Sequence, residues 1–75
     1  MKVFICLRGD RFEKVEGDLA SALIWVDAWY VHYEAKEDGY IVPTPLNPGG
    51  RYRGGKLVGG IKVGAERYTV VEYEL

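Results

Sequence analysis

The densest run of apolar residues extends from residue 18 to residue 33 and contains both tryptophans. Asp18 opens this run as a favourable N-cap, because its carboxylate can accept a hydrogen bond from a free N–H group of a first helical turn. Leucine and alanine follow, so we predict a helix from Asp18 to about Ala28. Its apolar residues point in every direction rather than along one stripe. Such a helix is either buried on nearly all sides or leaves an apolar flank for a partner.

The period of the pattern changes after this segment. Over residues 29–36 β-prone and polar residues alternate, Asp38-Gly39 is a typical hairpin turn, and residues 40–42 can form the returning strand. We therefore predict a second hairpin at this place. The alternative is one long helix over residues 19–36.

The amino-terminal pattern predicts a hairpin. Residues 2–7 carry apolar side chains on both faces, which is typical of a central strand. Gly9-Asp10 supplies a two-residue turn, with glycine at the position that a type II′ turn prefers. Residues 11–16 can return as the second strand.

The carboxyl-terminal third predicts a final pair of strands. Residues 68–75 alternate most clearly, and residues 57–63 form a weaker strand in which Gly59 and Gly60 indicate a bulge or a close backbone approach. Before this pair, residues 43–56 contain three prolines and the glycine pairs 49–50 and 54–55, which predict a long Pro/Gly-rich loop.

These elements predict a single small α+β domain over residues 1–75. We expect five or six antiparallel or mixed strands with one helix packed on the sheet, in the order hairpin, helix, hairpin and terminal strands. In this order the topology resembles a ubiquitin-like β-grasp, in which an opening hairpin and one helix precede the remaining strands. A small SH3-like β-barrel, with the region after Asp18 partly in strand, is the alternative.

Composition adds an expectation of self-association. The chain is 48% hydrophobic and has two tryptophans, six tyrosines and two phenylalanines. A domain of 75 residues buries only about 60% of the surface of its unfolded chain. A single copy therefore does not easily bury all of these apolar side chains. We predict a noncatalytic interaction module that forms a homo-oligomer through an aromatic-rich surface; a monomer with scattered surface tyrosines is the alternative. The predicted interface residues are Trp25, Trp29, Tyr30 and Tyr33.

Charge is distributed unevenly and indicates a second possible function. The formal net charge is −1, yet residues 39–65 contain four basic side chains and no acidic one. Within them the segment G-G-R-Y-R-G-G-K, residues 49–56, combines flexible glycines, guanidinium groups for phosphates and a ring for base stacking. It resembles RGG-type RNA-binding segments. The alternative, which we favour slightly, is a solvated loop whose arginines pair with acidic segments before and after it. The alternative function is single-stranded RNA or DNA binding through Arg51, Tyr52, Arg53, Lys56 and Lys62.

Catalytic and metal-binding patterns are weak. Cys6, Ser21 and His32 occur once each, and their spacing does not bring a nucleophile beside a base. One cysteine and one histidine give no recognisable zinc spacing. Residues 50–57 nearly match a phosphate-binding loop, but Leu57 replaces the hydroxyl that should hold magnesium. The sequence therefore favours a noncatalytic protein over an enzyme and predicts neither a cofactor nor a metal.

The remaining features concern location. With one cysteine no disulfide can form within the chain, and no apolar run is long enough for a signal peptide or a membrane span. We therefore expect a cytoplasmic protein without a membrane partner. The chain lacks glutamine and has a single asparagine and a single methionine, a composition similar to that of hyperthermophile proteins.

Overall fold

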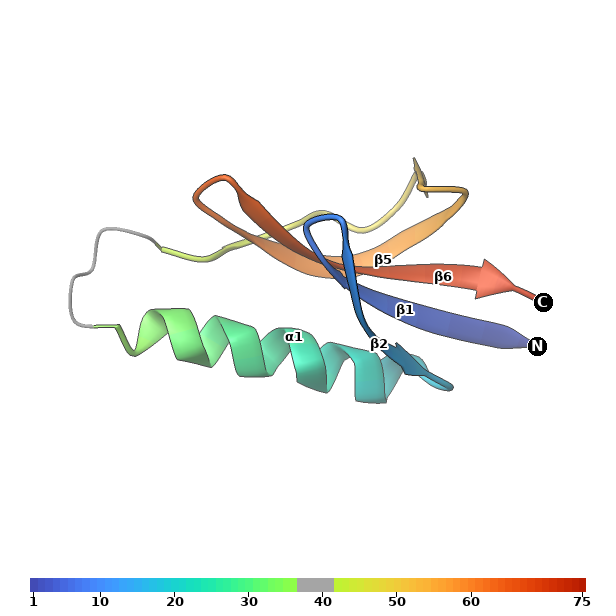
Figure 1. Ribbon diagram of the computed structural model, residues 1–75, viewed down its shortest axis with the longest axis horizontal. Helices are drawn as coiled ribbons and strands as arrows, with labels where there is room; N and C mark the ends of the chain where they lie inside the picture. Colours follow the sequence, from blue (N-terminus) through green and yellow to red (C-terminus); the bar gives the residue numbers. More distant parts are fainter. Residues whose placement is uncertain (37–41) are drawn as a thin grey trace.

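The computed structural model describes residues 1–36 and 42–75, which form one antiparallel sheet with a helix packed on it (Figure 1). This arrangement confirms the predicted α+β domain with one helix. The elements in these residues are β1 (Lys2–Arg8), β2 (Arg11–Glu16), α1 (Leu19–Glu34), β3 (Thr44–Pro45), β4 (Arg51–Tyr52), β5 (Gly55–Val63) and β6 (Glu66–Glu74).

The sheet places the two long carboxyl-terminal strands beside the first strand of the chain. Its order is β2-β1-β6-β5-β3, with β4 also paired to β5. The predicted amino-terminal hairpin is confirmed, because Arg8 pairs with Arg11 across the Gly9-Asp10 turn and Gly9 has φ +62°. β1 lies between β2 and β6, as predicted for a central strand. Its apolar residues are buried on both faces, since Phe4 and Cys6 pack in the core with α1 and Leu7 is buried on the opposite face.

The helix begins as predicted but continues further. Asp18 is the N-cap, and one of its carboxylate oxygens accepts from the Ser21 backbone N–H at 2.7 Å. The helix then extends to Glu34, so the strand predicted over residues 29–36 is wrong and the single-helix alternative is right. The aromatic side chains in this segment lie at helical spacing over the sheet, and this packing overrides the local β propensity. The predicted turn at residues 38–39 lies outside the described residues, as does most of its returning strand.

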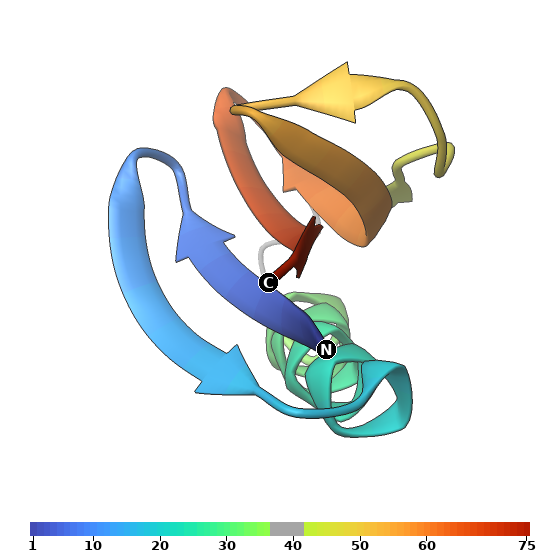
Figure 2. The ribbon, with the colours of Figure 1, turned by 90° about the vertical axis from the view of Figure 1, so that its right-hand side faces the viewer.

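The main core lies between α1 and the sheet. It contains Phe4, Cys6, Ala22, Val26, Ile61, Val63, Tyr68 and Val70. On the opposite face of the sheet Thr69 and Val71 are also fully buried, although no helix covers them. The sheet is strongly curled (Figure 2), and the turn after β4 folds back over this face, where the Tyr73 hydroxyl donates to the Arg53 carbonyl at 2.6 Å. Curling therefore gives a second, smaller buried layer.

The Pro/Gly-rich segment is more regular than predicted. Residues 43–56 were expected to be a loop, but they contain β3, β4 and the start of β5. The predicted bulge is confirmed, because the pairing of β5 with β6 shifts register between Leu57 and Gly59. The close approach is confirmed as well, since a Cβ on Gly60 would lie 2.4 Å from the Tyr68 carbonyl oxygen. β3 and β4 are ordered by their hydrogen bonds to β5, and such pairing between strands cannot be predicted from local composition.

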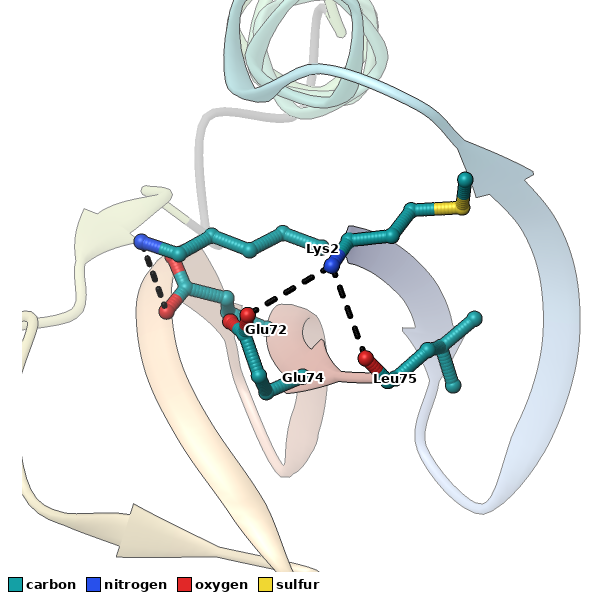
Figure 3. A network of polar contacts seen from close by, with 5 residues as sticks. Lys2, Glu72, Glu74 and Leu75 are labelled. Atoms are coloured by element: carbon teal, nitrogen blue, oxygen red, sulfur yellow. Dashed lines mark hydrogen bonds and ion pairs between the residues drawn. The ribbon is translucent and has the colours of Figure 1, made fainter.

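The two ends of the chain meet on adjacent strands (Figure 3). The amino group of Met1 lies 3.5 Å from the Glu74 carboxylate, and the Lys2 ammonium lies 3.7 Å from the Glu72 carboxylate. The Leu75 backbone N–H donates to the Met1 carbonyl at 2.7 Å. Three of the four charged groups are more than half exposed, so these ion pairs contribute little net stabilisation.

Candidate interaction surfaces

The four residues predicted to form an oligomer interface lie on the inner face of α1. Trp25, Trp29, Tyr30 and Tyr33 are half-buried and pack against the core of their own subunit. The Trp29 ring centroid lies 4.8 Å from that of Tyr68 on β6, and the Tyr33 centroid lies 5.7 Å from it. Most of this aromatic surface is thus used within one copy of the chain.

Tyr68 is the centre of this cluster. Its hydroxyl forms a hydrogen bond with the hydroxyl of Tyr33, and its side chain is fully buried. Burial raises the pKa of Tyr68 well above its ordinary value, and the Tyr33 hydrogen bond raises this pKa further. The guanidinium of Arg8 lies 4.9 Å from the centroid of the Trp29 ring, and its Nε donates to Glu66 at 3.2 Å. Arg8 therefore covers the edge of the aromatic cluster, and its charge is already paired with Glu66.

A shallow hollow of about 450 Å³ lies beside this cluster. It is lined by Arg8, Ala28, Trp29, His32, Tyr33 and Lys36. The Lys36 ammonium lies 5.1 Å from the Tyr33 ring centroid, and His32 meets Trp29 edge to face at 5.4 Å. Because the two cations that line the hollow, Arg8 and Lys36, already lie over rings of the same chain, these contacts are explained by folding alone.

The outer face of α1 is apolar and exposed. Ile24 is 68% exposed and Val31 is 60% exposed. Alanines at residues 20, 28 and 35 lie on the same face at helical spacing, and all three are exposed. Together with Ile24 and Val31 they form an apolar stripe along the outer face of α1. The sequence pattern indicated an apolar flank on this helix but did not identify these residues. The spacing of seven residues between Ile24 and Val31, which is two helical turns, was the sequence signal that could have identified them.

A second exposed apolar pair lies on β2. Phe12 is 62% exposed and Val15 is 52% exposed. Phe12 pairs with Leu7 and Val15 pairs with Ile5, so both belong to the sheet face that α1 does not cover. Sequence reasoning placed these residues in a strand but did not assign them to a surface.

The predicted anion-binding residues are divided between three places. Arg51 and Lys56 are direct neighbours across β4 and β5, next to a hollow that Glu72 and Glu74 also line. Arg53 bonds to Asp10 in the first hairpin and lies 5.5 Å from the centroid of the Tyr52 ring. Lys62 lies further along β5, opposite Arg67 on β6.

The candidate nucleophiles are held by structural contacts. Cys6 is fully buried, and burial raises the pKa of its thiol to about 11, so the thiol stays protonated at neutral pH. The Ser21 hydroxyl donates to the second carboxylate oxygen of Asp18 at 3.0 Å. The side chain of His32 instead contacts aromatic rings.

Two further features are absent from residues 1–36 and 42–75, which the structure describes. Over this part of the chain the structure contains no helix that is long and apolar enough to cross a membrane. The same residues contain no group of three or more histidine, cysteine, aspartate or glutamate side chains placed to hold a metal ion. Comparison of the whole chain with protein-family models, curated proteins and solved structures finds no match.

Proposed function

We propose that this chain is a noncatalytic interaction module that self-associates, with the outer face of α1 bound to the same face of a second copy. The observation that carries the proposal is the exposure of Ile24 and Val31 on a helix whose other side is already packed. Fully burying an aliphatic side chain of this size stabilises by about 1.5–3 kcal/mol. A second copy of the chain supplies the apolar surface needed for this burial.

The stripe suits an antiparallel pair of helices. Ile24 and Val31 are two helical turns apart, so a two-fold axis midway between them places Ile24 of each copy against Val31 of the other. Alanines at residues 20, 28 and 35 allow the two backbones to approach closely. Asp27 borders the stripe near the axis, where the two copies of its carboxylate repel each other.

The test is the mass of the chain in solution, measured by sedimentation or light scattering from 1 to about 100 μM, a range in which weak self-association is detected. The I24E/V31E variant should form a smaller species than the natural chain, because its new carboxylates would be buried against each other. The D27N variant should instead strengthen association roughly threefold, because it removes the repulsion between the two copies of the Asp27 carboxylate. A natural chain that is monomeric over the whole range would overturn the proposal.

A second candidate function is the binding of single-stranded RNA or DNA. The observation that favours it is the placing of like charges opposite each other. Lys62 faces Arg67, and Arg51 faces Lys56, whose other neighbour across the sheet is Glu72. Like charges directly opposite each other destabilise a sheet, and a bound phosphate would relieve this repulsion. Tyr52 at the end of β4 and Arg53 in the turn after it would contribute a ring and a further cation.

Fluorescence anisotropy with a labelled mixed-sequence single-stranded RNA tests this function. With about three phosphate contacts, affinity should fall roughly twentyfold between 50 and 200 mM salt. R51A/K56A should remove most of the binding, whereas K36A, at an exposed lysine on the carboxyl-terminal side of α1, should leave it unchanged. Absence of binding at 50 mM salt would end this candidate.

A further inference from the structure

One helix is a small contact for a stable assembly. The 16 residues of α1 extend over about 24 Å, and a stripe of that length covers roughly 240 Å², whereas a stable interface buries about 800 Å² on each partner. A stable assembly therefore needs a second self-complementary surface. The free edge of the sheet at β2 is such a surface.

β2 ends the sheet and is paired on one side only, with β1. In Figure 2 it lies on the outer side of the sheet (light blue), away from β5 and β3. Five of its six residues are exposed, and Glu16 is half-buried. An unpaired strand of this kind presents its backbone N–H and C=O groups to another strand.

The sequence of β2, R-F-E-K-V-E, is complementary to itself when it is read in the opposite direction. An antiparallel copy related by a two-fold axis between residues 13 and 14 brings opposite charges together at both positions. It also brings the two apolar residues together. The facing pairs are Arg11 with Glu16, Phe12 with Val15 and Glu13 with Lys14.

A β-bulge makes this pairing consistent with the faces of the strand. In a regular strand residues three apart point to opposite faces. Here the step from Phe12 to Val15 matches the two-residue step from Leu7 to Ile5 on β1, so β2 has one extra residue at this point. Phe12 and Val15 consequently share the sheet face that α1 leaves uncovered. In the pair, each would extend the apolar row of the other copy.

We infer that β2 pairs with β2 of a second copy, so that the sheet continues from one copy into the next. Charges on an edge strand prevent pairing when like charges face each other, but here each charge of β2 faces its opposite. This contact shares with the proposed function the premise of self-association, but it uses another surface, so the two can fail separately. Together, two such two-fold contacts build an assembly larger than a dimer.

The test isolates the edge contact by using I24E/V31E as the background, in which the helix contact is lost. This background should remain a dimer. Adding E13K places lysine opposite Lys14, and adding K14E places glutamate opposite Glu13; each change should weaken the dimer at least about tenfold. Mixing the two variants in equal amounts should restore dimers, because the changed strands are complementary to each other. K36E, which makes the same charge change as K14E but outside β2, is the matched control for K14E and should leave the dimer unchanged.

Hydrogen exchange gives a second measurement. The amides of Phe12 and Val15 in the I24E/V31E background should become more protected as the protein concentration rises, because new strand pairing protects edge amides. A folded I24E/V31E chain that is monomeric, beside a natural chain that is dimeric, would overturn the edge contact and leave the proposed function standing. A natural chain that is monomeric would overturn both. Failure of the mixed variants to recover the dimer would overturn the edge contact alone.

Discussion

The two faces of α1 are both apolar, but they differ in the size and the exposure of their side chains. The inner face carries large aromatic side chains, with Trp29 and Tyr33 packed around the buried Tyr68. The outer face carries two branched aliphatic side chains, Ile24 and Val31, among alanines. Large rings fill the wide space between a helix and a curled sheet, whereas small and medium side chains suit close contact between two helices. Side-chain size therefore separates the two faces where hydrophobicity does not.

This difference changes where an interface is expected. The tryptophans were the natural choice for an interface because they are the largest apolar residues of the chain. In the folded chain they are half-buried against the core of their own subunit, whereas Ile24 and Val31 are the most exposed large apolar side chains of α1. Variants on the two faces should accordingly have opposite effects: inner variants should change stability, and outer variants should change mass.

The largest expected effect is that of Trp29→Ala. Removing this ring leaves a gap between α1 and β6 and should lower the free energy of unfolding by about 3 kcal/mol, the lower end for a large aromatic residue because Trp29 is half-buried. Urea unfolding followed by circular dichroism measures the change. If Trp29→Ala kept its stability and instead dissociated the assembly, the inner face would be the interface.

The stability of the fold at alkaline pH should depend on Cys6, which lies in the core under α1. The pKa of Cys6 rises from 9.0 to about 11 on folding because the thiol is buried under α1. The folded chain thus holds this proton more tightly than the unfolded chain, so the contribution is complete below pH 9 and is lost as the pH rises from 9 to 11. The free energy of unfolding should fall by up to about 1.4 kcal/mol per pH unit in this window.

Urea titrations between pH 8 and about pH 11, with Cys6→Ala as the reference, isolate this effect, because the variant lacks the thiol but keeps the other titrating groups. The difference in unfolding free energy between the two proteins should decrease steadily above pH 9, the ordinary pKa of the thiol. A difference that is independent of pH would show that the Cys6 thiol is not shielded by the helix.

Tyr33→Phe should have a smaller effect. It removes the hydroxyl partner of the buried Tyr68 and keeps the ring contact, so the unfolding free energy should fall by about 1 kcal/mol. Tyr30→Phe is the matched control, because within the described residues its hydroxyl makes no hydrogen bond. Equal losses in the two variants would show that the hydroxyl pair adds nothing to stability.

The smallest effect should be that of Ile24→Ser on the monomer. In dilute solution the unfolding free energy should change by no more than about 0.5 kcal/mol, since this side chain contacts mainly water in one copy of the chain. The same variant should weaken association at high concentration. A large loss of monomer stability would place Ile24 within the fold and remove the contrast between the two faces of α1.

Local signals in the sequence determined much of the fold. The Gly9-Asp10 turn, the Asp18 cap, the final strand and the bulge near Gly59 all depend on neighbouring residues, and the structure contains each of them. Turn and cap preferences arise within a few residues, which is why they can be recognised in a single sequence. The surplus of apolar residues was likewise visible from composition alone.

Tertiary structure decided the rest. The end of α1 at Glu34, beyond the predicted change to strand, depends on contacts with β6, which is distant in sequence. Burial of Thr69 and Val71 depends on the curl of the sheet and the return of the turn after β4. The choice of which side of an evenly apolar helix faces the core also required the sheet. Periodicity assigns a face only when one side of a helix is polar, and in α1 neither side is.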